Sequence, residues 1–443
     1  MKSIVCMLAF VFLSIPAAAQ NAKTYTSLQE IWRTLARQNL SLARLDAALE
    51  QTELEARVRE ASRLPVLTAG GGYNFISETA RLTLPFTLPG MPVQEIEAGV
   101  NHQYDLNLRV QQPLFTGFRL QNEVALSRTQ RENVSLQKAI ARNRLFLLAG
   151  QIYYRYQLNR MQQALLQKGL ARLDLQLQKV RSFFRSDQAT SFDTLEVFNR
   201  RLELANRLQQ LRRHERIILT QLQHVLNDSA TVRIAETPPH SRPPIRLLPL
   251  QSYFQQALQF RPELQQLSLR EKAQSHKIRI AKSALWPQIF ASASFHYARP
   301  GVNFFEDEWM TYYTVGIQMQ WRLWTWRQDG YRIQQAQIEQ ERLRLQRRAL
   351  VQDIRQQVQE AYLNLQSALE QIRLQERLVA QERERYRRVS EQYDQGQAAL
   401  LDLRNAEIRL TEAELQLQSN YIEAYQAHLQ LQFAIGKFEP VQP

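Results

Sequence analysis

The sequence contains one unit written twice, and this duplication constrains the fold more than any other feature. Pro65 aligns with Pro287 at a shift of 222 positions, and Asp193 aligns with Asp402 at a shift of 209. The difference of about 13 residues predicts an insertion in the first copy, which we place at residues 82–94. A long repeat of this kind predicts two halves with the same succession of helices and strands.

Each copy contains segments in which apolar and polar residues strictly alternate. Residues 104–111 and 314–323 show this alternation most clearly. A period of two with one apolar face is typical of a strand that is buried on one side only. Matching segments earlier in each copy complete two predicted β-hairpins, at about residues 66–112 and 288–323. Their polar side chains are Asp105, Asn107 and Arg109 in the first hairpin and Gln318, Gln320 and Arg322 in the second.

The remainder of each copy has a helical period. Leucines from Leu166 to Leu177 are spaced four and three residues apart, which is the pattern of a coiled-coil seam. The Pro-rich segment 229–249 cannot be helical throughout and predicts a linker between the copies. The first repeat, residues 20–228, contains predicted helices at 27–62, 118–185 and 190–226. The second repeat, residues 250–435, contains predicted helices at 250–284, 328–393 and 398–435, and a tail follows at 436–443.

Residues 1–19 have the features of a secretory signal peptide. A basic Lys2 precedes an apolar stretch of about a dozen residues, and small residues supply a cleavage site before Gln20. The only cysteine, Cys6, lies inside this signal, so we predict a mature chain without thiols that is not a lipoprotein. Export argues against a nucleic-acid partner, although the net charge is +14 and the pI is about 9.9.

The sequence lacks recognisable catalytic and metal-binding patterns. It has no phosphate-binding glycine loop, no G-x-S-x-G nucleophile motif and no H-E-x-x-H zinc motif. His214 and His224 are ten positions apart on a predicted helix, a spacing that does not favour metal ligation. We therefore predict that the protein is not an enzyme and needs no cofactor or metal.

The predicted strands are too few to close a barrel within one chain. Since no mature segment is long and apolar enough for a transmembrane helix, a membrane location would require a β-barrel shared between copies. Two copies would supply eight strands, whose interior is filled by side chains, whereas three would supply twelve and could leave a channel lined by the polar faces. The alternative is a soluble sheet. Aromatic residues near the ends of the fourth strand predict an interfacial belt, namely Trp309, Tyr312, Tyr313, Trp321 and Trp324.

From Leu28 to Lys437 the chain resembles the TolC-like outer membrane efflux proteins, or outer membrane factors. The resemblance is carried by the duplicated order of elements and by RLPVL and LWPQI at the start of each hairpin, QPLFTG after the first hairpin and YDQGQAALLDLRNAE before the last helix. It implies an α+β membrane protein whose homotrimer forms a twelve-stranded β-barrel in the outer membrane of a Gram-negative bacterium. A periplasmic α-helical barrel, holding most of the mass, would continue the β-barrel.

The resemblance also implies a function and partners. The trimer would be a passive exit duct for efflux, including multidrug efflux, or for type I secretion. A periplasmic adaptor protein and an inner-membrane RND or ABC pump would deliver the substrate and supply the energy. The alternative is an exported coiled-coil scaffold or adaptor without a pore. The sequence leaves the substrate open.

The resemblance further implies a constriction at the periplasmic tip. Acidic residues at the turn into the last helix would line this constriction. Asp402 falls on the first acidic position, whereas Asn405 takes the second, so a double acidic ring is not expected. Asp193, the repeat partner of Asp402, is the third gate candidate. Both aspartates could instead cap the starts of their helices, or do both.

Overall fold

The computed structural model describes residues 23–83, 95–228, 231–235 and 244–438. The predicted signal peptide, most of the inserted loop, the centre of the Pro-rich linker and the last residues of the tail lie outside the described residues. Two compact units can be distinguished. The sheet unit comprises Arg44–Ile140 and Arg261–Ile354, and the hairpin unit comprises Met1–Ala43, Ala141–Phe260 and Arg355–Pro443.

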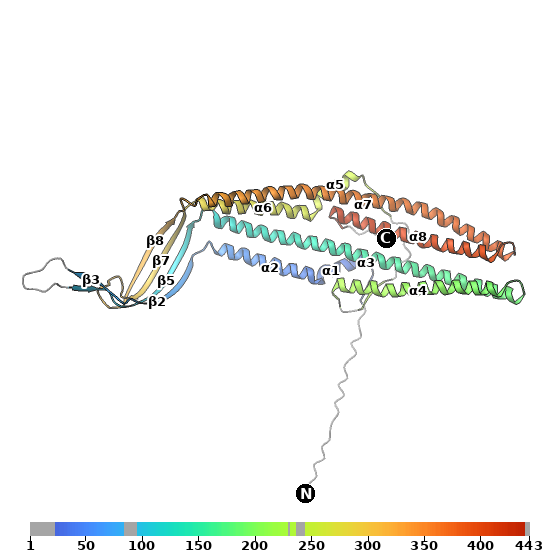
Figure 1. The fold of residues 1–443 in the computed structure, drawn as a ribbon, viewed down its shortest axis with the longest axis horizontal. Coiled ribbons are helices and arrows are strands. Elements are labelled where there is room, and N and C mark those ends of the chain that lie inside the picture. The colour runs from blue at the N-terminus through green and yellow to red at the C-terminus, as the bar shows by residue number, and fades with distance from the viewer. Residues whose placement is uncertain (1–22, 84–94, 229–230, 236–243, 439–443) are drawn as a thin grey trace, which may run out of the picture. The chain divides into compact units, whose positions relative to one another are not determined.

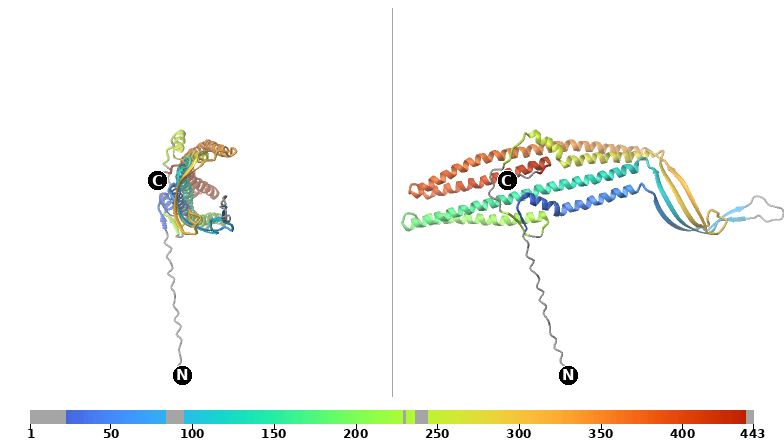
Figure 2. Two further views of the ribbon diagram at one scale, coloured as in Figure 1. Left: turned by 90° about the vertical axis from the view of Figure 1, so that its left-hand side faces the viewer. Right: turned by 180° about the vertical axis from the view of Figure 1, so that it is seen from behind.

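The sheet unit contains a four-stranded antiparallel sheet in the order β2-β5-β7-β8 (Figure 1). The two hairpins therefore join through β5 and β7, and the four strands form one curved sheet (Figure 2). A separate two-stranded ribbon, β3-β4, flanks the predicted insertion. The strands are β2 Val66–Phe75, β3 Ala80–Thr83, β4 Glu95–Ala98, β5 His102–Phe115, β7 Gln288–Arg299 and β8 Met310–Gln320.

The register of the sheet collects the apolar side chains on one face. Leu108 pairs with both Ala69 and Phe295, and Phe295 pairs with Tyr313. Residues directly opposite in neighbouring antiparallel strands project to the same face, so the alternation seen in the sequence continues across all four strands. Most side chains of this apolar face are exposed. An exposed apolar surface of this extent marks a place where another molecule or a membrane is bound.

The structure corrects two predictions for the fourth strand. β8 ends at Gln320, not at residue 323, because its partner Gln288 is the first residue of β7 and is preceded by Pro287. Arg322 therefore lies beyond the strand and is not part of its polar face. Tyr312 was predicted to belong to the aromatic belt, yet it pairs with His296 and thus lies on the polar face.

Helices of both copies continue from the sheet within the same unit. Arg128 of α3 bonds Glu60 of α2 at 2.5 Å, and Gln274 of α6 donates to the carbonyl of Ala336 in α7 at 2.8 Å. His276 of α6 lies 3.2 Å from the amide oxygen of Asn122 in α3. The helices thus follow the order α2-α3-α6-α7. The bounds are α2 Leu40–Ala61, α3 Arg119–Arg185, α6 Pro262–Lys282, the 3-10 turn η1 Ser283–Leu285 and α7 Gln328–Asp394.

The hairpin unit pairs α3 with α4 and α7 with α8 (Figure 1). One core cluster surrounds Trp32, whose ring stacks on Phe146 at 5.1 Å and whose indole N–H donates to the Phe146 carbonyl. A second cluster contains the predicted leucine seam of α3, packed against α4 and α8. The other elements are β1 Lys23–Tyr25, parallel to β6 Val232–Ile234, with α1 Leu28–Gln38, α4 Ser191–Leu226, α5 Leu250–Phe260 and α8 Leu400–Ile435. None of the described helices is both long and apolar enough to cross a membrane.

A helix break that the sequence did not predict occurs at the same place in both copies. The segment 27–62 is divided at Asn39 and the segment 250–284 at Arg261, positions related by the shift of 222. The Asn39 side-chain oxygen accepts hydrogen bonds from the N–H groups of Ser41 and Leu42, which starts a new helix. Pro262 follows Arg261 and suits only the first turn of a helix.

Replacing Asn39 with alanine should destabilise the hairpin unit. Asn39 is 5% exposed, and its amide also donates to the carbonyl of Val225 at 2.8 Å. Loss of a cap and of a buried hydrogen bond should together cost about 2 kcal/mol. Thermal unfolding of the detergent-solubilised protein, followed by circular dichroism, measures this, with exposed Gln51→Ala as the control. An unchanged midpoint for Asn39→Ala would show that the break does not depend on this side chain.

Candidate functional site

The two turns that join the long helices to α4 and α8 have the same backbone. Asp187 has a φ of +53° and its repeat partner Gly396 a φ of +72°. In both turns a glutamine N–H closes the helix end, from Gln188 to the Phe183 carbonyl and from Gln397 to the Gln392 carbonyl, each at 2.8 Å. The two copies therefore share individual backbone hydrogen bonds at these turns of the hairpin unit.

Glycine should be the better residue at position 187. Left-handed backbone is strained for residues with a Cβ, by about 1 kcal/mol for an aspartate. We expect Asp187→Gly to stabilise the α3-α4 hairpin by about that amount and Gly396→Ala to destabilise the α7-α8 hairpin. Urea or thermal unfolding of the two variants provides the comparison. Destabilisation by Asp187→Gly would mean that the Asp187 carboxylate makes a contact that matters more than backbone strain.

The two aspartates that follow these turns have different surroundings. Asp193 forms a capping box with Thr190: its carboxylate accepts from the Thr190 N–H at 2.8 Å, and the Thr190 hydroxyl accepts from the Asp193 N–H at 3.2 Å. Ala399 stands in the place of Thr190 in the second copy and makes no side-chain cap. Asp402 is exposed, as is Asn405 one turn later. Of the two alternatives, capping is thus observed for Asp193, while the Asp402 carboxylate projects into solvent.

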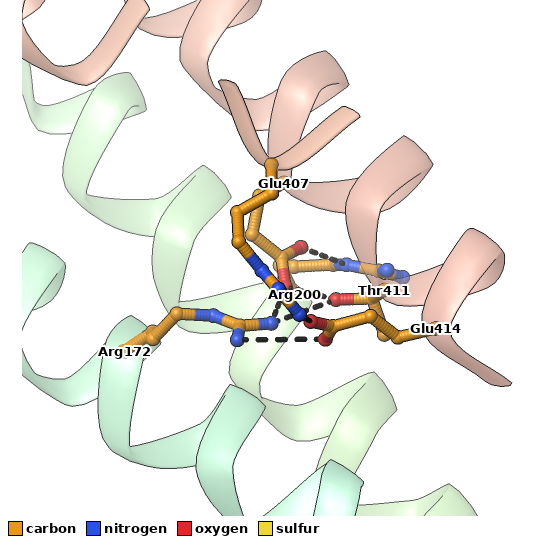
Figure 3. Close-up of polar contacts among 6 residues, drawn as sticks. Arg172, Arg200, Glu407, Thr411 and Glu414 are labelled. Carbon is orange, nitrogen blue, oxygen red and sulfur yellow. Dashed lines mark hydrogen bonds and ion pairs between the residues drawn. The ribbon is translucent and has the colours of Figure 1, made fainter. Parts of the chain in front are cut away.

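A buried charge network that the sequence did not reveal connects the two helical hairpins (Figure 3). Its centre is Glu407 of α8, which is 1% exposed. The Glu407 carboxylate accepts a hydrogen bond from the Thr411 hydroxyl at 2.7 Å. It also lies 3.6 Å from the guanidinium of Arg172 in α3 and 3.7 Å from that of Arg200 in α4. One carboxylate therefore contacts cations from both helices of the other hairpin.

Further contacts extend this network outward. Arg172 donates to the Thr411 hydroxyl at 3.0 Å and lies 3.9 Å from Glu414. Arg383 of α7 donates to the other oxygen of Glu414 at 2.9 Å. The Arg172 guanidinium also lies over the ring of Tyr386, and burial raises the pKa of the Tyr386 hydroxyl, so this ring remains neutral at physiological pH. We call Arg172, Arg200, Glu407, Thr411 and Glu414 the hairpin network.

The polar face of the sheet carries five of the six predicted lumen-facing residues. Asp105 accepts from Asn107 at 2.6 Å and lies 2.8 Å from His296, which stacks on Tyr312. Arg109 donates to the Ser294 hydroxyl across the β5-β7 pair. Gln318 and Gln320 lie on the same face of β8, by their register with Phe290 and Gln288, and only Arg322 falls outside the face.

The belt candidates separate into two groups at opposite ends of the sheet. Trp309 stacks on Tyr297 at 4.6 Å, near exposed Tyr313 at the start of β8. Trp321 and Trp324 follow the end of β8, and the Trp321 indole donates to the carbonyl of Leu285 at 3.2 Å. In the part of the chain that the structure describes, no group of three or more potential metal ligands is found.

Comparison with known proteins finds one family model and several similar solved structures. Residues 253–437 match the family described as outer membrane efflux protein. The solved structure of CusC, described in connection with transmembrane channel formation, has a TM-score of 0.76 and 16% identity over 95% of this chain and 96% of CusC. VceC from Vibrio cholerae has a TM-score of 0.73 and 15% identity over 93% and 96%. The open state of MtrE from Neisseria gonorrhoeae has a TM-score of 0.71 and 17% identity over 93% and 89%. A comparison with curated protein sequences gave no match.

The four-stranded sheet and the two repeats of long helical hairpins together give this chain the fold of these outer-membrane proteins. The family match of the second repeat agrees with that class. The resemblance inferred from the sequence is thereby confirmed: residues 253–437 match the outer membrane efflux protein family, and the chain as a whole has the fold of CusC and VceC. The family is one of transport channels.

Proposed function

We propose that three copies of this chain form a passive exit duct in the outer membrane of a Gram-negative bacterium. The observation that carries the proposal is the sheet itself, which has two unpaired edges and an exposed apolar face. Each unpaired backbone group would cost several kcal/mol in lipid, so β2 and β8 must each find a partner strand. Joining β8 of one copy to β2 of the next satisfies both edges. Three copies then give twelve strands.

The edge helices of the sheet unit support the same arrangement. α7 exposes Tyr331, Ile338 and Leu345, which are spaced seven residues apart. At the other edge, α2 exposes Leu54 and Val58. Apolar residues in this spacing form seams between helices in coiled coils. Since the two seams differ, the interface between copies is heterologous, and such interfaces form closed rings when the rotation between copies allows it.

The polar face of the sheet would line the duct, while its apolar face would contact outer-membrane lipid. This division favours the channel over a coiled-coil scaffold without a pore, because a scaffold has no use for an apolar exterior on its sheet. The chain supplies no recognisable catalytic constellation, so the energy of transport would come from partners. We propose an inner-membrane RND or ABC pump and a periplasmic adaptor protein that contacts the ends of the hairpins.

Single-channel recording tests the proposal. The purified protein, added to a planar lipid bilayer at neutral pH, should give discrete conductance steps, and native mass spectrometry in detergent should detect three chains. Substituting Gln318 and Gln320 with lysine should shift ion selectivity toward anions, because these residues would line the pore. A protein that stays in solution without detergent and gives no conductance would establish the scaffold instead.

A further inference from the structure

The segment that connects β8 to α7 departs from the internal repeat. We call residues 321–327, with the sequence WRLWTWR, the tryptophan rim. The corresponding residues of the first copy, 112–118, have the sequence QPLFTGF. The second copy thus has three tryptophans and two arginines where the first has two phenylalanines and no cation. Gly117 and Phe118 of the first copy adopt the same left-handed backbone as Trp326 and Arg327, so the turn itself does not require these residues.

Two of the three tryptophan rings of the rim are largely exposed to solvent, whereas the Trp321 indole bonds the Leu285 carbonyl. Trp324 is 73% exposed and Trp326 is 83% exposed, and the two rings meet edge to face at 5.8 Å. Trp326 has a φ of +51° and corresponds to Gly117 of the first copy. A Cβ added at Gly117 would lie 2.7 Å from the carbonyl oxygen of Ser283. A tryptophan in left-handed backbone is strained, and such a conformation persists only where the surrounding structure imposes it.

The two arginines of the tryptophan rim are exposed, and in the part of the chain that the structure describes neither forms an ion pair. No acidic residue occurs between Glu308 and Asp329, and Asp329 is buried beside Arg332. In the first copy, by contrast, Arg119 bonds Glu123 at 3.0 Å. The charges of Arg322 and Arg327 are therefore available to an external anion.

We propose that the tryptophan rim binds the anionic headgroup of a phospholipid at the inner edge of the membrane. Arg322 and Arg327 would pair with the headgroup phosphate, for which the arginine fork is well suited. Trp324 and Trp326 would lie among the headgroups, as amphipathic rings do at membrane interfaces. The rim directly continues the exposed apolar face of β8. This inference rests on the proposed function, because it requires that face to contact lipid.

Fluorescence quenching by brominated lipid tests the inference with the full protein. The protein is reconstituted into vesicles of phosphatidylcholine and phosphatidylglycerol in which one of the two lipids is brominated. A Trp324→Phe/Trp326→Phe variant assigns the part of the signal that comes from the rim. Each arginine near a membrane surface contributes a factor of about five, so rim quenching should show at least about a fivefold preference for phosphatidylglycerol.

Charge variants and a second reporter complete the experiment. Arg322→Gln/Arg327→Gln should reduce the preference to about one, whereas Arg119→Gln should leave it unchanged. Equal preference for phosphatidylglycerol in the wild type and the double arginine variant would overturn the inference. Quenching of Trp309 without quenching of the rim would also overturn it, because a neighbouring copy would then cover the rim. Absence of both Trp309 quenching and channel conductance would overturn the proposed function and the inference with it.

Discussion

Glu407→Gln should loosen the contact between the two helical hairpins and increase the time that the channel spends in its most conducting state. The substitution keeps the shape of the side chain and leaves Arg172 and Arg200 facing a neutral amide. Removing one partner of a buried ion pair costs about 3–5 kcal/mol. Both nitrogen–oxygen distances exceed 3.5 Å, so we expect the lower end, about 3 kcal/mol. Thermal unfolding and single-channel recording measure the two effects.

Glu203→Gln is the matched control for this experiment. Glu203 also bonds Arg200, at 3.0 Å, but its side chain is mostly exposed. An exposed pair of this kind contributes about 0–1 kcal/mol, so this variant should unfold and conduct like the wild type. A double-mutant cycle with Arg172→Met then tests the coupling between Arg172 and Glu407 directly. Equal effects of Glu407→Gln and Glu203→Gln would show that the buried network does not hold the hairpins together.

The sequence predicted the elements of the fold well because two periods and a duplication specified them independently. Strand alternation around Leu108 and the leucine seam around Leu173 each determine which side chains meet, and both contacts are present in the structure. The duplication then extends each local inference to the other copy. The structural similarity of the two copies includes the turns at Asp187 and Gly396, where residues of different type adopt the same left-handed backbone.

Features that depend on contacts between distant segments were not predictable in this way. Arg172 and Glu407 lie far apart in the sequence, and their repeat partners are Gln381 and Phe198, so the duplication gives no sign of the hairpin network. The true end of β8 depends on where β7 begins, which alternation alone cannot show. The face of Tyr312 differs from the sequence prediction for a similar reason, because it is determined by the register of Tyr312 with His296.

The break at Asn39 illustrates a third limit. A helix of period 3.6 continues across it without interruption in the apolar pattern, and asparagine alone is a weak signal within such a run. Its effect comes from a tertiary hydrogen bond to the Val225 carbonyl, which holds the side chain where it can start a new helix. Pro262 in the second copy is the stronger signal of a helix start, and the repeat relates the break before it to position 39 of the first copy.

Asp402→Ala should change the ion selectivity of the channel, because three copies would bring three unpaired carboxylates to the ends of the hairpins. Asp402 has no capping partner, unlike Asp193, whose carboxylate is held by Thr190. A ring of carboxylates in a pore raises the local concentration of cations. We therefore expect the ratio of cation to anion permeability to fall several-fold in Asp402→Ala, with little change in stability, as measured from reversal potentials across a salt gradient.

The repeat supplies the variants that separate a pore-lining role from a structural one. Ala399→Thr would give Asp402 the partner that Thr190 gives Asp193, and so should stabilise α8 by about 1 kcal/mol while drawing the carboxylate back toward the helix start. Selectivity should then fall as it does in Asp402→Ala. Asp193→Ala should do the opposite, losing about 1 kcal/mol of capping energy without affecting selectivity. If Ala399→Thr stabilises the protein but its reversal potential equals that of the wild type, Asp402 does not face the ion path, and the constriction must be sought among other residues of the hairpin ends.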